Sequence, residues 1–384
     1  MDNSKIRSQF PILKKITYFD SAALVLKPQC AIDSSNEFYT NFSISSRTQD
    51  TPLGNFINQK VHETRQKTAD LIDAQSDEII FTSGTTQSLN TLAQMLGPIV
   101  NADDVILLSS YNHSSNMIPW IELAKAKKAK IIFSENIEND INPKVKIVAL
   151  AQETNNFNVN FDIKKIYQKC LENDALLIND AAQSIAHEKS SLKYAHALVF
   201  STNKLYGPTG LGVLAIKKEL LAQIKPVEYG GGTLSAIDQN ANWTPKKGIQ
   251  IYEPGTQNLA GIFMFNSSLD FLNTVGYEQT QKILKELSLY LHQELKKIKN
   301  VEIYTVPGDS ITLINVKNVN AQDVATYLGT KNIYTIAGIF CAPYLRNIQS
   351  QHSFLRISLG IYNTFEDIDK LIKELKEGGD FYAF

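Results

Sequence analysis

Short apolar runs alternate with longer amphipathic stretches between residues 79 and 216. Seven of these runs are rich in β-branched or other apolar side chains and have the length of buried strands. They are Ile79 to Thr82, Val105 to Ser109, Lys130 to Phe133, Ile147 to Ala151, Ala175 to Asn179, Ala197 to Ser201 and Gly212 to Ile216. Helix-like stretches lie between most of them, at Thr86 to Leu96, Ile118 to Ala126 and Ile163 to Glu172. This alternation predicts a mostly parallel, seven-stranded, doubly wound α/β sheet.

The pattern changes after Thr256 to longer helix-like segments and a second set of short strands. The expected elements are Leu259 to Val275, Tyr277 to Ile298, Val301 to Thr305, Ile311 to Val316, Ala321 to Leu328, Phe354 to Leu359 and Glu366 to Glu377. A chain of 384 residues exceeds what one hydrophobic core usually supports. We therefore expect a large domain over residues 15–262 and a smaller α/β domain made of residues 1–14 and 263–384.

The overall charge favours no polyanionic partner. The formal net charge is -1 and the pI is about 6.6, so we expect neither nucleic acid nor an anionic membrane as partner. No apolar run approaches the length that spans a bilayer, and the N-terminus lacks a signal-peptide core, which predicts a cytoplasmic protein. The three cysteines, Cys30, Cys170 and Cys341, have no metal-binding spacing and fit a reducing compartment.

Two neighbouring predicted strands end near opposite charges. One run leads to Asp180, and the other leads to Lys204 in a loop that Gly207, Pro208 and Gly210 hold open. Because parallel strands end at one edge of a sheet, Asp180 and Lys204 are expected to lie close together. A lysine that forms an imine and a carboxylate beneath a ring nitrogen are what pyridoxal 5'-phosphate requires. The alternative is that both residues are solvated loop charges or helix caps.

Hydroxyl side chains stand where a phosphate group would bind. Thr85 and Thr86 follow the first strand and open a helix, where unpaired amides and the helix dipole attract an anion. Ser201 is expected to reach the same phosphate from the opposite side. The alternative for the two threonines is an ordinary helix cap.

His113 and Gln183 are candidates for contacts with the cofactor ring. His113 follows the second strand at the same sheet edge, where an imidazole can stack on the ring and move a proton. Gln183 lies three residues after Asp180 and is placed to donate to the phenolic oxygen. His187 is the next histidine candidate because it follows Gln183 closely. A structural role is the alternative for either histidine.

Cys341 and Arg356 are candidates for contacts with a substrate. Cys341 lies in a segment from Ala337 to Pro343 that has the character of a mobile loop. Arg356 is flanked by apolar residues, and a half-buried arginine suits a bidentate grip on a carboxylate, hence an amino-acid substrate. A nearby thiol, once deprotonated, attacks sulfur carried by that substrate. The alternatives are an inert thiol and an internal salt bridge.

These motifs resemble one known family. The chain is similar to the fold-type I, class V aminotransferase-like enzymes, and most closely to the SufS-like (group II) cysteine desulfurases and selenocysteine lyases. The resemblance runs from Tyr18 through Thr364. It rests on Ser83-Gly84-Thr85-Thr86, Asn112-His113, Asp180-Ala181-Ala182-Gln183, Asn203-Lys204 with Gly207-Pro208-Thr209-Gly210, Pro254-Gly255-Thr256-Gln257-Asn258 and Arg356-Ile357-Ser358.

The resemblance implies an activity and further site residues. The expected reaction converts L-cysteine to L-alanine and leaves a persulfide on Cys341, from which sulfur passes to an acceptor protein in iron-sulfur cluster assembly or tRNA thiolation. The family arrangement is a homodimer in which Thr256 of one subunit helps to hold the phosphate of the other. Asn155 matches a position near the substrate and the ring, and Arg356 matches the carboxylate-binding arginine.

The sequence departs from the family pattern at four places. Asn203 stands where a histidine usually precedes the lysine, which replaces a cationic phosphate contact with a neutral donor. Ile336 stands where the cysteine loop usually begins with arginine, and Ile339 and Phe340 stand where two histidines usually precede the thiol.

Two alternative functions stay open at this point. In the first, the cofactor is kept but Cys341 is incidental, as in a selenocysteine lyase or another class V lyase or aminotransferase. In the second, the chain is a non-catalytic scaffold whose chemistry has decayed, although intact Lys204 and Asp180 argue against it.

Overall fold

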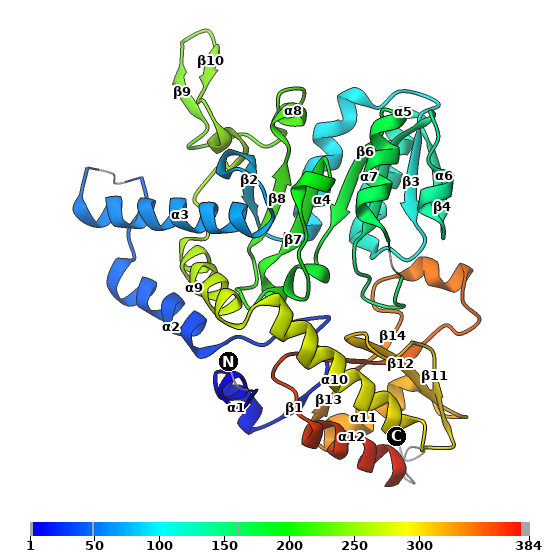
Figure 1. The fold of residues 1–384 in the computed structure, drawn as a ribbon. Coiled ribbons are helices and arrows are strands. Elements are labelled where there is room, and N and C mark those ends of the chain that lie inside the picture. Colours follow the sequence, from blue (N-terminus) through cyan, green and yellow to red (C-terminus); the bar gives the residue numbers. More distant parts are fainter. Residues whose placement is uncertain (1–2, 48–49, 160, 378–384) are drawn as a thin grey trace.

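The computed structural model describes residues 3–47, 50–159 and 161–377, and a seven-stranded sheet forms its centre (Figure 1). The order across this sheet is β2-β8-β7-β6-β5-β3-β4. The strands are β2 (Ile79–Thr82), β3 (Val105–Ser109), β4 (Lys130–Ser134), β5 (Val145–Ala151), β6 (Leu176–Asp180), β7 (Ala197–Ser201) and β8 (Gly212–Ile216). Neighbouring strands are parallel except at β8, which runs antiparallel to β2 and β7. The predicted mostly parallel sheet is confirmed.

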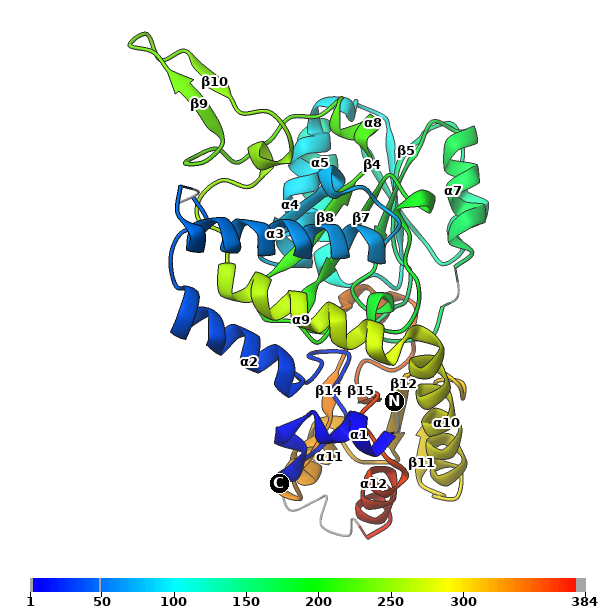
Figure 2. The ribbon, with the colours of Figure 1, turned by 60° about the vertical axis from the view of Figure 1, so that its left-hand side comes forward.

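Helices cover both faces of the sheet. Figure 2 shows α4 (Thr85–Leu96) and α5 (Ile118–Lys127) on one side of the strands and α7 (Ile163–Glu172) on the other. In β5, Ile147 and Ala149 join the apolar cluster under α4 and α5, whereas Val148 and Leu150 join the cluster under α7. Successive side chains of a strand point to opposite faces, so a strand covered on both sides must be apolar at nearly every position. This two-sided burial explains the continuous apolar runs in the sequence.

A second sheet of four antiparallel strands forms the C-terminal part. Its order is β11 (Val301–Ile303), β12 (Ile311–Val316), β15 (Phe354–Ser358) and β14 (Ile336–Gly338). The accompanying helices are α10 (Tyr277–Leu295), α11 (Ala321–Thr330) and α12 (Phe365–Glu377). Helix α10 ends before the predicted Ile298 because the chain tightens there, with Ile298 N donating to Leu295 O at 3.0 Å. The expected smaller α/β unit is otherwise present.

Two successive helices, α9 and α10, link the large sheet to the small one. Helix α9 (Leu259–Val275) runs through the predicted boundary at residues 262 and 263, and Gly276, with φ of 77°, turns the chain into α10. Near the N-terminus, β1 (Thr17–Tyr18) pairs in parallel with β13 (Ile333–Tyr334). The division into residues 15–262 and residues 1–14 with 263–384 stays a prediction.

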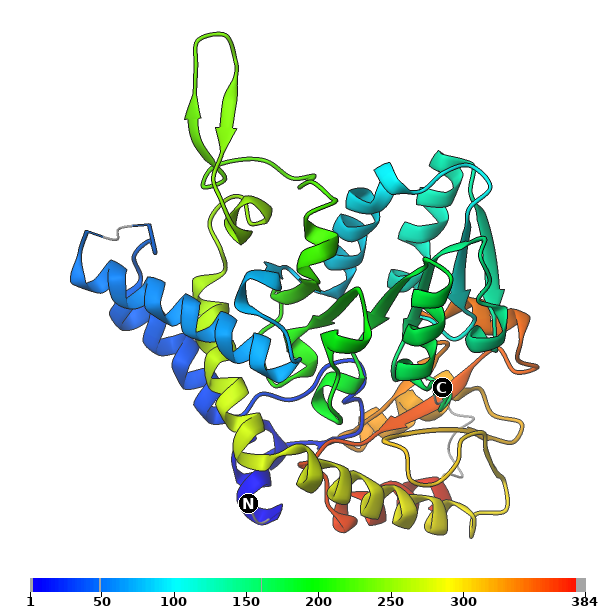
Figure 3. The same cartoon turned by 45° about the horizontal axis from the view of Figure 1, so that its top comes forward.

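Several elements have no counterpart among the sequence predictions. Helices α2 (Gln29–Glu37) and α3 (Pro52–Leu71) pack against α9 (Figure 3). A hairpin of β9 (Leu234–Ile237) and β10 (Trp243–Pro245) stands out from the body (Figures 1 and 3), and its Ile237 and Trp243 side chains are exposed. The remaining short helices are α1 (Asn3–Ser8), α6 (Ile137–Asp140) and α8 (Lys218–Leu221).

A pair of glycines allows β8 to approach the turn between β2 and α4. A Cβ atom added at Gly212 would lie 2.4 Å from the Cα atom of Gly84, and backbone atoms there cannot move aside as a flexible side chain can. We therefore expect Gly212→Ala to lower the free energy of unfolding by about 3 kcal/mol. Gly329→Ala is the matched control, since no atom lies within 4 Å of a Cβ there. In helix α11 it should stabilise the protein by about 0.5–1 kcal/mol. Urea unfolding of both variants distinguishes steric crowding from a general intolerance of alanine.

Within the described part of the chain, no helix combines the length and apolar character that crossing a membrane requires.

Candidate active site

A cavity of about 310 Å³ lies at the carboxyl edge of the large sheet, and the β14 and β15 region of the small sheet contributes to its lining. Its walls come from the segments that follow β2, β3, β5, β6 and β7, the edge where ligands bind in open α/β sheets. The structure brings eleven of the twelve predicted site residues together here. They are Thr85, Thr86, His113, Asn155, Asp180, Gln183, Ser201, Asn203, Lys204, Cys341 and Arg356.

The amino end of helix α4 forms one end of this cavity. No side chain caps the helix at Gly84, and the Thr85 amide instead donates to the hydroxyl of Ser201 at 2.7 Å. The Thr85 and Ser201 hydroxyls are 2.8 Å apart, and the Thr86 hydroxyl is 2.8 Å from that of Ser115. A helix start with converging hydroxyls fits the phosphate group of a cofactor.

Asp180 and Lys204 face the cavity with shifted pKa values. Burial raises the pKa of Asp180 to about 6, although the Ala182 amide and the charge of Lys204 oppose the shift. Burial lowers the pKa of Lys204 to about 8, against the attraction of Asp180. A lysine with this pKa is partly neutral near physiological pH, and only a neutral amine attacks an aldehyde.

His113 is neutral in this environment. Burial, followed by the charges of Lys204 and Arg356, lowers the pKa of the imidazole to about 4. Its Nδ1 accepts a hydrogen bond from the Ser115 amide at 3.1 Å, which assigns the ring proton to Nε2. A neutral ring suits stacking on a cofactor. Gln183 donates from Nε2 to Ala22 O at 2.9 Å and keeps a second N–H for a ring oxygen.

Arg356 forms the internal salt bridge that the sequence left open and still has donors to spare. Its Nη2 pairs with Asp20 Oδ1 at 2.7 Å, which is the internal salt bridge, and its Nη1 donates to Asn155 O at 2.9 Å. The Phe340 ring covers the guanidinium at 4.7 Å. The buried Nε has no hydrogen-bond partner among the described residues, and such an atom calls for an acceptor. Three of the five N–H donors are thus left for a carboxylate.

The segment that carries Cys341 is held at two carbonyl groups. Asn155 Nδ2 donates to Phe340 O, and Ser114 N donates to Cys341 O, both at 2.7 Å. Cys341 is exposed and lines the cavity, as does Ile336. The Phe340 ring packs on the guanidinium of Arg356. Phe340, which stands where the family usually has histidine, therefore has a structural contact in this chain.

Thr256 lies outside this cavity. It is exposed and lines a separate cavity of about 280 Å³ together with Arg47, whose guanidinium donates to Gly231 O and Gly255 O. Within one subunit Thr256 therefore does not join the other candidates. Its predicted role belongs to a second copy of the chain and stays a prediction.

Sequence reasoning missed Asp20 and Glu153. Asp20 pairs with Arg356, and Glu153 lines the cavity while its two oxygens lie 3.0 Å from His187 Nδ1. The signal for Asp20 was its place in the segment where the family resemblance begins, two residues after Tyr18. His187 is not among the cavity residues, and the paired carboxylate raises its pKa in spite of burial.

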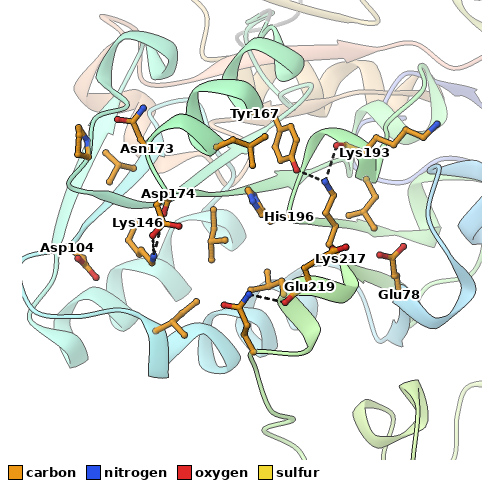
Figure 4. Close-up of a pocket in the computed structure, with 18 of the residues that line it drawn as sticks. Glu78, Asp104, Lys146, Tyr167, Asn173, Asp174, Lys193, His196, Lys217 and Glu219 are labelled. Carbon is orange, nitrogen blue, oxygen red and sulfur yellow. Dashed lines mark hydrogen bonds and ion pairs between the residues drawn. The ribbon is translucent and has the colours of Figure 1, made fainter.

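A larger cavity of about 980 Å³ opens at the amino edge of the same sheet (Figure 4). Two of the lysines that line it are engaged with their neighbours. Lys217 Nζ donates to Tyr167 Oη at 2.5 Å and to Lys193 O at 3.1 Å, and Lys146 pairs with Asp174 at 2.9 Å. The smaller cavity brings Asp180, Lys204 and His113, all with shifted pKa values, together with Cys341 and Arg356, and is therefore the candidate active site.

The doubly wound sheet, with its smaller α/β unit, is the fold of the fold-type I pyridoxal-phosphate enzymes. Residues 17–371 match the Aminotransferase class-V family, and the chain belongs to that family. A probable cysteine desulfurase of Ureaplasma parvum is 37% identical over 95% of this chain and 94% of that protein. Two solved structures that are 26% identical to this chain are similar to it in fold. The apo cysteine desulfurase of Thermococcus onnurineus has a TM-score of 0.93, with 97% of each chain covered. An Escherichia coli cysteine desulfurase in an S-sulfonic acid form has a TM-score of 0.90, with 98% of each chain covered.

Proposed function

We propose that this protein is a pyridoxal-phosphate-dependent cysteine desulfurase that converts L-cysteine to L-alanine and leaves a persulfide on Cys341. The observation that carries the proposal is a single cavity that unites Lys204 and Asp180 with a thiol and a buried arginine. Relatives that cover nearly the whole chain are named as probable cysteine desulfurases.

The residues fit the cofactor, which when bound withdraws electrons from the α-carbon of an amino acid. Lys204 would hold its aldehyde covalently and, after release, move a proton with its free amine. Asp180 would keep the ring nitrogen protonated, and Gln183 would donate to the ring oxygen. Thr85, Thr86, Ser201 and Asn203 would bind the phosphate.

Arg356 would bind the substrate carboxylate with the donors that Asp20 and Asn155 leave free. A substrate held in this way would place its sulfur in the cavity that Cys341 lines. Attack by the Cys341 thiolate forms a sulfur–sulfur bond and breaks the carbon–sulfur bond, while the substrate β-carbon takes up a proton. One cysteine and one thiol thus give one alanine and one persulfide, without an external oxidant.

The wider arrangement is part of the same proposal. A homodimer would bring Thr256 of one subunit to the phosphate of the other, in agreement with its separation from the cavity in the single chain. An acceptor protein in a cytoplasmic setting would then take the sulfur from Cys341, whose exposure suits such a transfer.

The test is a spectrum joined to product analysis. Purified protein incubated with pyridoxal phosphate should acquire a visible absorption band, and L-cysteine should shift that band and release alanine. Mass spectrometry should find one added sulfur atom on Cys341. A colourless protein would contradict the proposal, as would a preferred substrate that lacks sulfur.

A further inference from the structure

Two loops that follow strands of the large sheet donate hydrogen bonds to the backbone carbonyl groups of Phe340 and Cys341. The Phe340 carbonyl accepts from Asn155 after β5, and the Cys341 carbonyl accepts from Ser114 after β3. These are hydrogen bonds from the large sheet to the segment that follows β14 of the small sheet. The position of the thiol is therefore set by contacts with the large sheet as well as by β14, the strand that precedes it.

Asn156 fixes the orientation of the Asn155 amide. Asn156 Nδ2 donates to Asn155 Oδ1 at 2.9 Å and to Tyr111 O at 3.1 Å, while its Oδ1 accepts from Phe157 N at 2.8 Å. Because Asn155 Oδ1 is thus engaged as an acceptor, its NH₂ group faces Phe340 O. Both asparagines are buried, so water does not compete for these bonds.

The backbone at Phe340 and Cys341 has an unfavourable conformation. Phe340 and Cys341 both have φ of 55°, a left-handed region that residues with a side chain rarely adopt, and two in succession are rarer still. Such a conformation persists where surrounding contacts impose it. Here these contacts are the turn hydrogen bond from Ala342 N to Ile339 O at 2.9 Å, the two hydrogen bonds from the large sheet and the packing of Phe340 on Arg356.

We infer that Asn155 is a positioning residue for the nucleophile, which acts by docking the Cys341 loop on the large sheet. This inference rests on the proposed function in one respect only, namely that Cys341 is the nucleophile. Asn155 thereby links the two substrate-facing groups, since its backbone carbonyl binds Arg356 and its side chain binds the thiol loop.

Amide hydrogen exchange tests the docking directly, because the Ser114 amide donates to Cys341 O and loses its acceptor when the loop lifts. In Asn155→Ala, exchange at Ser114 should be about five-fold faster, as expected from the loss of one hydrogen bond. Asn156→Val should have a smaller effect in the same direction. The control Asn158→Ala, an exposed asparagine in the same segment, should leave exchange at Ser114 unchanged. Exchange in β3 reports whether each variant stays folded.

Kinetics with L-cysteine supply the second readout. Misplacing the thiol should lower kcat of Asn155→Ala about 10- to 100-fold. KM should change less than about two-fold, because Arg356 keeps its backbone partner. Unchanged exchange at Ser114 together with reduced kcat would overturn the inference, since Asn155 would then act on the substrate alone. If exchange at Ser114 is faster in Asn155→Ala but the wild-type protein forms no alanine from L-cysteine, the proposed function is contradicted and the docking role of Asn155 is kept.

Discussion

Replacing Lys204 with alanine should lower alanine release from L-cysteine by at least about 10⁴-fold, because one side chain would hold the cofactor and also move protons. Borohydride reduction of the wild-type protein loaded with pyridoxal phosphate should attach the label to Lys204, as peptide mapping will show. The Lys204→Ala protein should carry no label in that peptide. Lys125→Ala, which removes an exposed amine far from the cavity, is the control and should keep full activity. A label on another lysine would contradict the assignment.

The pH dependence of cofactor uptake follows from the same residue. Burial lowers the pKa of Lys204 from 10.5 to about 8. The fraction of Lys204 that is neutral therefore rises about tenfold per pH unit below pH 8 and levels off above it. The initial rate at which the cofactor-free protein takes up pyridoxal phosphate should therefore rise from pH 6 and reach half of its maximum near pH 8. An ordinary lysine would give a rate that still rises at pH 10.

Replacing Cys341 with serine should lower alanine formation by about 10²- to 10⁴-fold while the spectral response to L-cysteine is kept. The hydroxyl of serine cannot form the sulfur–sulfur bond on which the proposed turnover depends. The Arg356 and Lys204 contacts would be untouched, so the variant should still bind cofactor and substrate. The measurements are alanine release and the shift of the visible band.

Cys30→Ser is the matched control for this experiment. Cys30 is also an exposed free thiol, but it lies in helix α2 and does not line the cavity. Its replacement should leave alanine release within about two-fold of wild type. If Cys341→Ser retains full turnover, the thiol is incidental and a related lyase becomes the better description.

The sequence predicted those parts of the site that lie directly after strands. Asp180 ends β6, Lys204 follows β7 and His113 follows β3, so a correct strand pattern was enough to place them at one edge of the sheet. The strands themselves were identifiable because they are buried on both faces. Residues at the ends of different strands thus come together through topology alone.

Long-range contacts of the smaller sheet were not predictable in this way. The pairing of Asp20 with Arg356 joins positions near opposite ends of the chain, and no local pattern encodes that meeting. The amide of Asn155 faces Phe340 only because Asn156 engages its oxygen. The β9 and β10 hairpin was missed because its exposed residues lack the apolar alternation of a half-buried strand.

The Phe340 ring on the guanidinium has a consequence for how such a protein diverges. The residue that immediately precedes the proposed nucleophile also covers the guanidinium proposed to bind the substrate carboxylate. A substitution of Phe340 would therefore change both the binding of the substrate carboxylate at Arg356 and the position of the Cys341 thiol, so the two properties cannot evolve independently. Compensating exchanges in the loop and in the arginine-bearing strand should accordingly occur together.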